Sequence, residues 1–301
     1  MINSIKNTKN YDLIVIGAGS GGVRAARIAA NHGAKVAIIE SVRVGGTCVL
    51  RGCVPKKLLV YGAHIAHDIE DAAGFGWNIG SIEHDWLKLI NAKDNELDRL
   101  NNIYLGLLSK VEIIDGFGKI VSNNEVEVNG NIIKSKKILI AVGGKPFLPE
   151  IKGIDLCINS DQALDLKSLP KKIIINGGGY IALEFASIFA SFGSDVTLIY
   201  RGKNLLRGFD TDISNLIKEE CIKNNIKILT ETQINSVSKT NNGLSVMLNN
   251  KEEIFSNEVM FATGRIPNTS GLGLNELGIK TGKVGEIIVD KNNKTNANNI
   301  Y

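Results

Sequence analysis

The sequence is poor in several features that mark whole classes of protein. Aromatic residues make up 6% of its 301 residues, proline occurs five times and cysteine four times. No stretch approaches the roughly 18 uninterrupted apolar residues of a membrane-spanning helix. The first ten residues are largely polar and lack the apolar centre of a secretory signal peptide. We therefore expect a cytoplasmic protein with no membrane partner.

The chain also lacks an excess of either charge. Its 35 basic residues nearly balance 31 acidic ones, and no basic cluster is interleaved with aromatic residues. This pattern argues against a nucleic-acid partner, because nucleic-acid-binding surfaces concentrate lysine and arginine. The length instead fits a globular chain of two ordinary domains.

Two of the few cysteines, Cys48 and Cys53, are separated by four residues in the run GGTCVLRGCVPKK, residues 45–57. We expect both sulfurs on the first turns of one helix, where the helix dipole lowers a thiol pKa and favours a reactive thiolate. The alternatives are a static disulfide and a zinc site. A lasting disulfide is improbable in a reducing cytosol, and zinc needs four ligands, whereas Cys157 and Cys221 stand alone. The spacing favours redox chemistry, and we expect no metal.

A dinucleotide-binding pattern precedes the cysteines. Residues 13–16 are an apolar run typical of a buried parallel strand, and a helix is expected from about Gly21 to Asn31, followed by a strand over 35–39. An acid, Glu40, ends this strand 23 residues after the first glycine, where an acid binds a ribose hydroxyl. The glycines at the dinucleotide spacing, which let the backbone approach a pyrophosphate, are Gly17, Gly19 and Gly22.

The same pattern occurs a second time. A strand over 171–176 leads into Gly177, Gly179 and Ala182, and a further strand covers 196–199. Where the first unit has an acid, this one has Arg201, with Arg207 six residues later. Two arginines in place of an acid favour a 2′-phosphate and therefore NADP. The alternative is that both arginines are simply solvated on a loop.

The remaining segments alternate in type. Residues 70–110 are expected to be largely helical with an interruption near 74–76, and residues 111–137 to form short antiparallel strands with a turn at Asn129-Gly130. Another set of strands is expected from residue 226 to 260.

Together with the late run ATGRIPN, residues 262–268, these motifs resemble the class I flavoprotein disulfide reductases, and within them most closely the glutathione reductases. The resemblance covers residues 11–301. It implies an α/β fold with two doubly wound Rossmann-like nucleotide-binding domains: an FAD-binding domain at 11–147, an NADPH-binding domain at 148–267, and an incomplete return to the FAD domain at 268–301. The family's C-terminal dimerisation domain is expected to be absent.

The resemblance also implies roles for individual residues. Electrons pass from NADPH to FAD, then to the Cys48–Cys53 disulfide and on to glutathione disulfide. Cys53 is the charge-transfer thiol beside the flavin and Cys48 the interchange thiol that meets substrate. Lys56 and Glu184 match the family's ion pair near the flavin, with a buried acid satisfied by the backbone as the alternative for Glu184. Tyr180 matches an aromatic gate over the nicotinamide, although it equally suits a packing role.

The resemblance also implies further cofactor contacts, at positions that match cofactor-binding positions of the family. Val142 stands where the family usually has threonine, which departs from the pattern at one phosphate-side contact. The positions carried over by resemblance are Ser20, Gly21, Gly46, Thr47, Gly118, Gly143, Ile181, Gly264 and Arg265.

Three residues are candidates for substrate binding. Arg24 and Arg27 lie about one helical turn apart, and arginine binds carboxylates such as those of glutathione in a bidentate manner. Arg27 and Tyr104 match substrate-contact positions of glutathione reductases, whereas trypanothione reductases, with a cationic substrate, have acidic or apolar residues in that helix. The alternative is a pair of solvated helix arginines.

Two other functions remain open. A lipoamide dehydrogenase would share the flavin and disulfide chemistry but use NAD and a neutral substrate. The second is a nucleotide-binding fragment without turnover. The family's mechanism needs an acid/base histidine from the partner subunit's C-terminal domain, and a chain without that domain would lack it. The four histidines here, His32, His64, His67 and His84, lie in the first domain. We expect a truncated chain, and a homodimer for the full-length family.

Overall fold

The computed structural model describes residues 9–301 of the chain and contains two compact units. The first consists of residues up to Cys53, Glu96–Lys145 and Ile266–Tyr301. The second consists of Val54–Asn95 and Pro146–Arg265. Each unit is built around a sheet whose central strands run parallel.

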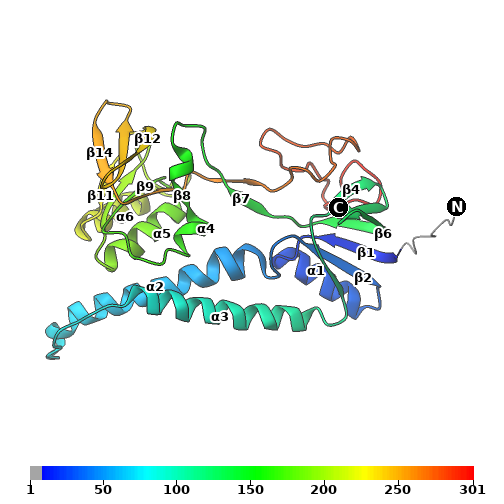
Figure 1. Cartoon of the computed structure of the whole chain (residues 1–301), viewed down its shortest axis with the longest axis horizontal. Helices are drawn as coiled ribbons and strands as arrows, with labels where there is room; N and C mark the ends of the chain where they lie inside the picture. Colours follow the sequence, from blue (N-terminus) through cyan, green and yellow to red (C-terminus); the bar gives the residue numbers. More distant parts are fainter. Residues whose placement is uncertain (1–8) are drawn as a thin grey trace. The chain divides into compact units, whose positions relative to one another are not determined.

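The first unit contains the dinucleotide pattern that precedes the cysteines (Figure 1). Its elements are β1 (Asn10–Ile16), α1 (Ser20–Asn31), β2 (Val36–Glu40), the π-helical turn η1 (Thr47–Arg51), β3 (Glu112–Asp115), β4 (Lys119–Ser122), β5 (Glu125–Val128) and β6 (Asn131–Ile140). The sheet order is β3-β2-β1-β6-β5-β4. The first four of these strands pair in parallel, and β5 and β4 extend the sheet in antiparallel fashion.

Both faces of this sheet are covered, which explains the continuous apolar run of β1. Ile14 and Ile16 belong to one buried cluster and Val15 to another, because successive side chains of a strand point to opposite faces. Helix α1 contributes Val23 and Ala26 to the second cluster. A run without polar residues is therefore what a strand buried on both sides requires.

Predictions for this unit hold for most elements and are wrong for one. The strands and helix of the glycine pattern form within a few residues of the expected bounds. The turn at Asn129-Gly130 is confirmed, with φ angles of 52° and 72°. β3, expected to be antiparallel, instead pairs in parallel with β2, from Ala37 beside Glu112 to Glu40 beside Asp115. Its neighbour lies far away in sequence, so local alternation could not reveal the direction.

The second unit repeats the parallel arrangement and adds an antiparallel sheet. Its elements are η3 (Ile154–Leu156), β8 (Ile158–Asn159), α4 (Ser160–Ala163), β9 (Lys172–Asn176), α5 (Tyr180–Ser191), β10 (Asp195–Ile199), α6 (Thr211–Lys223), β11 (Lys227–Leu229), β12 (Ile234–Thr240), β13 (Gly243–Leu248), β14 (Glu253–Ser256) and β15 (Glu258–Phe261). The parallel order is β11-β10-β9-β15-β8, and β12-β13-β14 form the antiparallel sheet. The expected second glycine unit and the strands between 226 and 260 are thus confirmed.

Helices α2 (Cys53–Asp71) and α3 (Trp86–Leu107), with the 3-10 turn η2 (Ala72–Phe75), fill the largely helical region, but the interruption extends through residues 76–85. The short strands β7 (Gly144–Pro146) and β16 (Arg265–Pro267) pair with each other. Residues 54–95 pack with the second unit, whereas the predicted FAD-binding domain includes them.

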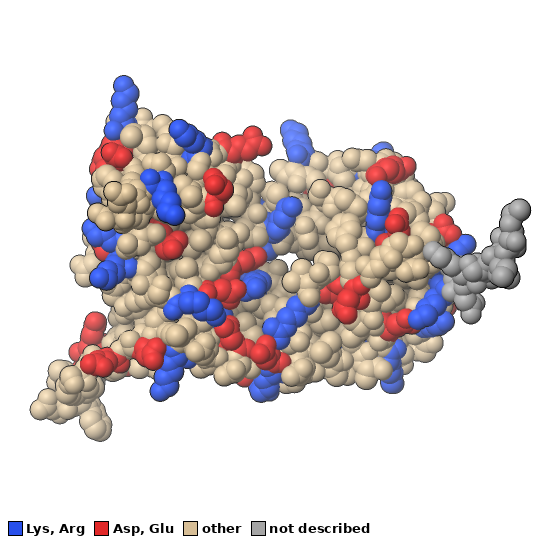
Figure 2. Space-filling model, in the orientation of Figure 1, with Lys and Arg blue, Asp and Glu red and all other residues tan. Residues whose placement is uncertain are grey.

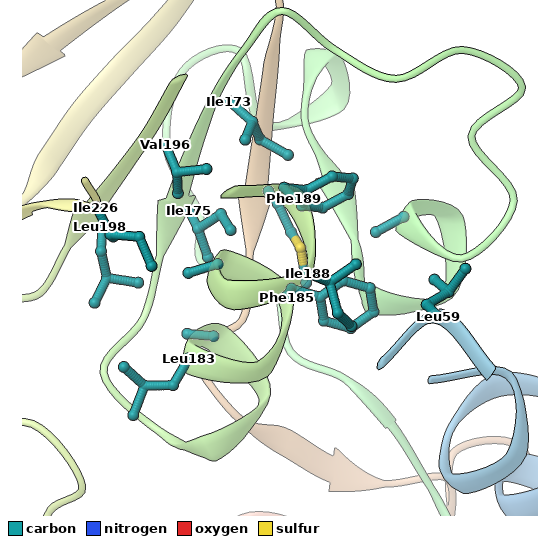
Figure 3. Packing of buried hydrophobic residues seen from close by; sticks show 14 of the residues in the cluster. Leu59, Ile173, Ile175, Leu183, Phe185, Ile188, Phe189, Val196, Leu198 and Ile226 are labelled. Carbon is teal, nitrogen blue, oxygen red and sulfur yellow. The ribbon is translucent and has the colours of Figure 1, made fainter. Parts of the chain in front are cut away.

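The core of the second unit surrounds α5 (Figure 3). Ile173 and Ile175 of β9 and Phe185 and Phe189 of α5 belong to this buried cluster. Leu59 of α2 packs on the same cluster. This packing explains why residues early in the chain belong to the second unit.

The last segment, Ile266–Tyr301, packs onto the first unit. Ile300 is fully buried and bridges to Ile138 in parallel, and Leu272 and Ile279 join the same cluster as Ile14. The two parallel sheets with helices confirm the α/β fold with two Rossmann-like domains.

No helix in residues 9–301 combines the length and apolar character needed to cross a membrane. On the face in view, basic and acidic side chains are interspersed, in keeping with the near balance of charge (Figure 2).

The backbone of α1 comes very close to the end of β1 at one position, Gly22. A Cβ placed on Gly22 would overlap the carbonyl oxygen of Gly17, whereas a Cβ on Gly21 would meet no atom within 4 Å. The helix can therefore approach the strand only with glycine at the third position of the pattern.

We predict that Gly22→Ala destabilises the protein by about 1–3 kcal/mol, because the methyl group must push α1 away from β1. Gly21→Ala is the matched control in the same helix, and it should be neutral or stabilise by up to about 1 kcal/mol through lower chain entropy. Urea denaturation followed by circular dichroism measures both. Equal effects of the two substitutions would show that the contact does not limit the packing.

Candidate functional site

The first glycine loop leaves a helix N-terminus open for an anion. Gly19 is the N-cap of α1, no side chain caps this helix, and no acid lies in its first turn. The amide groups at Ser20 and Gly21, both exposed, keep their partial positive charge. This end of α1 therefore suits a phosphate.

A hollow lies at the carboxyl ends of β1 and β2. Gly17, Glu40 and Gly118 are among the residues that line it. The Glu40 carboxylate accepts hydrogen bonds from the amide of Ala18 at 2.7 Å and from those of Ser41 and Val42 at 3.0 Å. The acid is thus fixed beside the glycine loop, where the sequence predicts a ribose.

Sequence reasoning missed several residues of this hollow. Phe117, which is 51% exposed, lines it together with its neighbours Gly116 and Gly118. Asn268 and Leu272 reach it from the return segment. Residues 116–118 directly follow β3, which pairs in parallel with β2. Had this parallel pairing been predicted from the sequence, it would have placed these residues beside Glu40.

The cysteine segment is attached directly to the glycine loop. The amide of Gly45 donates to the carbonyl of Ala18 at 2.9 Å. Gly46 has φ of 62°, and a Cβ there would overlap the Cα of Gly19. Only glycine fits at this position, because the two backbones touch.

The expected single helix for both sulfurs is wrong. Cys48 lies in the π-helical turn η1, and Cys53 is the first residue of α2. Gly52, with φ of −156° and ψ of −105°, separates the two elements. Both thiols are free, Cys48 half-buried and Cys53 exposed.

The expected lowering of the thiol pKa is also wrong for Cys48. A hydrogen bond with Cys53, burial, and the charge of Cys53 raise the pKa of Cys48 to about 11. The causes are the neighbouring thiol and burial, and a second negative charge beside a first one is unfavourable. Cys48 therefore deprotonates less readily than an ordinary thiol.

The predicted ion pair between α2 and α5 is present. Lys56 Nζ lies 2.8 Å from Glu184 Oε1, and the two side chains are 24% and 35% exposed. Glu184 is thus neither fully buried nor satisfied by the backbone alone. Lys56 follows Cys53 by three residues in α2.

The second glycine loop repeats the first. Gly179 is the N-cap of α5, without a side-chain cap or an acid in the first turn. Tyr180, 58% exposed, begins the helix. Ile181 is half-buried and packs on the core, so its side chain serves the fold.

The predicted arginines lie after β10. Arg201 and Arg207 are both exposed, on a loop whose Leu206 amide donates to the carbonyl of Gly178 at 2.7 Å. Leu206 has φ of 52°, which is uncommon for leucine and marks a constrained loop. The structure thus joins the arginine loop to the second glycine loop.

The remaining candidates are dispersed. Arg24 is exposed and Arg27 half-buried on α1, and Tyr104 packs against the cluster beneath that helix. Thr47 is exposed at the start of η1. Gly143 and Gly264 are exposed and precede the paired strands β7 and β16, and half-buried Arg265 is the first residue of β16. The carbonyl of Gly143 accepts from the amide of Asn268, and that of Gly264 from the amide of Phe147.

The other two cysteines are buried. Burial is the main cause that raises the pKa of Cys157 to about 12 and that raises the pKa of Cys221. Within residues 9–301, no group of three or more histidine, cysteine or acidic side chains is arranged to hold a metal ion.

We predict that Cys53→Ala shifts the alkylation of Cys48 to lower pH. The substitution removes both the hydrogen bond and the charge that raise the pKa of Cys48, leaving only burial. Mass spectrometry of iodoacetamide-treated, reduced protein between pH 7 and 11 measures the midpoint for Cys48. Cys221→Ala is the control and should leave the midpoint unchanged. An unchanged midpoint in Cys53→Ala would show that the neighbouring thiol has no influence.

Comparison with known proteins agrees with this geometry. Glutathione reductase of Burkholderia cepacia is 46% identical over 294 residues, covering 97% of this chain and 66% of that protein. The chloroplastic/mitochondrial glutathione reductase of Pisum sativum is 47% identical, with coverage of 97% and 55%. That of Nostoc sp. (strain PCC 7120) is 43% identical, with coverage of 98% and 67%.

A solved structure is similar as well. The HOCl-induced flavoprotein disulfide reductase RclA from Escherichia coli superposes with a TM-score of 0.87 at 31% identity, over 97% of this chain and 65% of that one. The chain thus spans between about half and two thirds of the length of these proteins. The family model described as pyridine nucleotide-disulphide oxidoreductase matches residues 11–301. The chain belongs to the pyridine nucleotide-disulphide oxidoreductase family, and it is a homologue of the glutathione reductases.

Proposed function

We propose that this protein reduces glutathione disulfide with NADPH, using bound FAD and the Cys48–Cys53 pair. The observation that carries the proposal is the pair itself: two neighbouring free thiols, joined through Gly46 to the first glycine loop. Identity near 46% with a glutathione reductase supports the choice of substrate.

The first glycine loop fits FAD. The uncapped N-terminus of α1 suits the pyrophosphate, Glu40 the ribose, and the hollow beside Phe117 the adenine ring. We also assign Thr47 and Gly143 to the binding of FAD. Bound FAD supplies the two-electron link between the nicotinamide and the disulfide.

The second glycine loop fits NADPH. The N-terminus of α5 is uncapped, and Gly179 leaves open space above the backbone. Arg201 and Arg207 supply positive charge where the first unit has Glu40, which favours a 2′-phosphate over a free ribose hydroxyl. The same charge argues against an NAD-dependent lipoamide dehydrogenase.

The two thiols divide the exchange between them. Cys48 thiolate attacks one sulfur of glutathione disulfide, forming a mixed disulfide and releasing the first glutathione as a thiolate. Cys53 thiolate then attacks Cys48, restoring the Cys48–Cys53 disulfide and releasing the second glutathione. Two electrons from NADPH and two protons return the pair to its dithiol form.

The ion pair of Lys56 and Glu184 orients a positive charge on the helix that begins at Cys53. That charge stabilises negative charge on Cys53 and on the reduced cofactor. Glu184 is a positioning residue in this scheme, because it acts through the lysine.

Arg24 and Arg27 are proposed to bind glutathione carboxylates, with Tyr104 as a further substrate contact. We assign residues 11–147 to FAD, 148–267 to NADPH and 268–301 to the return segment. We propose a cytoplasmic location, and we propose a homodimer for the full-length family rather than for this chain.

We predict that the purified chain, loaded with FAD, oxidises NADPH in the presence of glutathione disulfide, and that Cys48→Ser lowers this rate at least about 1,000-fold, because it removes the attacking thiolate. The assay follows NADPH absorbance. Cys157→Ala, at a buried cysteine outside the pair, is the control and should retain most of the activity. An FAD-loaded chain without turnover would overturn the proposal in favour of a nucleotide-binding fragment. Full activity in Cys48→Ser would overturn the role of the pair.

A further inference from the structure

Tyr200 occupies an unusual place between the two loops of the proposed NADPH site. It directly follows β10 and directly precedes Arg201. Its ring is half-buried and packs against the core cluster around α5. Its backbone is fixed on both sides, since its amide donates to Leu229 at 2.9 Å and its carbonyl accepts from Thr232 at 3.1 Å.

The ring contacts a glycine of each loop. A Cβ on Gly178, in the glycine loop, would lie 2.5–2.7 Å from the ring atoms Cγ, Cδ1 and Cδ2. A Cβ on Gly202, in the arginine loop, would lie 2.6–2.9 Å from Cε1, Cζ and the hydroxyl oxygen. The inner end of the ring thus meets one backbone and the outer end meets the other, with no room for a side chain at either point.

Backbone hydrogen bonds and two buried leucines, Leu205 and Leu206, hold the loop that carries the arginines. One is the hydrogen bond from the Leu206 amide to the Gly178 carbonyl. Another is the hydrogen bond from the Glu231 amide to the Gly202 carbonyl, at 3.1 Å. The Tyr200 ring lies against both Gly178 and Gly202, the two glycines whose carbonyls accept these hydrogen bonds.

We propose that Tyr200 is a positioning residue for cofactor selection: its ring holds Arg201 and Arg207 at the spacing from the Gly177–Gly179 loop that an adenosine with a 2′-phosphate requires. The inference rests on the proposed NADPH preference. Guanidinium groups recognise a phosphate through directional hydrogen bonds, so the loop that carries them must be held in place before the ligand arrives.

The proposal assigns the effect to the ring and not to the hydroxyl. Among the hydrogen bonds described for residues 9–301, none involves the Tyr200 hydroxyl, whereas the ring atoms meet both glycines. Phenylalanine should therefore replace tyrosine, and a smaller aliphatic side chain should not.

The test measures binding of two probes by isothermal titration calorimetry, adenosine 2′,5′-diphosphate and 5′-AMP, which differ only in the 2′-phosphate. In Tyr200→Leu we expect the affinity for the diphosphate to fall about tenfold or more and that for 5′-AMP to change less than about threefold, so the ratio collapses. Tyr200→Phe should keep the ratio. Phe189→Leu, in the same core but without contact to these glycines, should lower the melting temperature and also keep the ratio.

A second variant tests the contact from the other side. Gly202→Ala places a methyl group against the intact ring, and the backbone at Gly202 does not lie in the left-handed region. We expect the same loss of discrimination as in Tyr200→Leu, and a partial recovery in the double variant, where the smaller side chain leaves room for the methyl group.

The outcomes separate the two claims. A wild-type protein that binds both probes equally overturns the NADPH preference, and the role of Tyr200 with it. A wild-type protein that prefers the diphosphate, together with unchanged ratios in Tyr200→Leu and Gly202→Ala, overturns the role of Tyr200 alone. A collapsed ratio in both Tyr200→Leu and Phe189→Leu identifies a general core defect and likewise overturns it.

Discussion

The contact between the backbones of Gly46 and Gly19 is the constraint on which the candidate site depends. Neither strand nor helix propensity brings these residues together. The left-handed φ of Gly46 and the hydrogen bond from Gly45 to Ala18 allow the approach. Since η1 begins at the next residue, the position of Cys48 relative to the glycine loop follows from this contact. A nucleotide loop and a dithiol are thereby joined within one unit by a few residues.

Both glycine loops are held by the same set of backbone hydrogen bonds. The amide of Gly17 donates to Ile39 at 2.8 Å, and that of Gly177 to Ile199 at 2.9 Å. A Cβ on either glycine would overlap a carbonyl oxygen, that of Ala141 in the first unit and that of Ala262 in the second. The same backbone arrangement thus occurs in both units. The units differ in the charge at the end of the second strand, where Glu40 ends β2 and Arg201 follows β10. An acid there suits a ribose hydroxyl and arginines suit a phosphate.

The sequence predicts well whatever depends on local patterns. Apolar runs and glycine spacing locate β1, α1, β9 and α5, because a strand buried on both faces and a loop against a pyrophosphate each allow few residue types. The parallel direction of β3 escapes this reasoning, since it depends on a partner some 70 residues away in sequence. The raised pKa of Cys48 escapes it as well, because it depends on the neighbouring thiol and on burial. The packing of residues 54–95 with the second unit, and the place of Tyr200, are likewise tertiary facts.

The central claim is that Gly46 fixes the cysteine pair against a flavin. Absorption spectroscopy of the FAD-loaded chain, before and after reduction of Cys48–Cys53 under anaerobic conditions, tests it most directly. The account predicts a long-wavelength shoulder on the flavin band when the pair is reduced, caused by the Cys53 thiolate beside the cofactor, and its loss in Cys53→Ser. Bound flavin with an unchanged spectrum on reduction, or a folded chain that binds no flavin, would contradict the account.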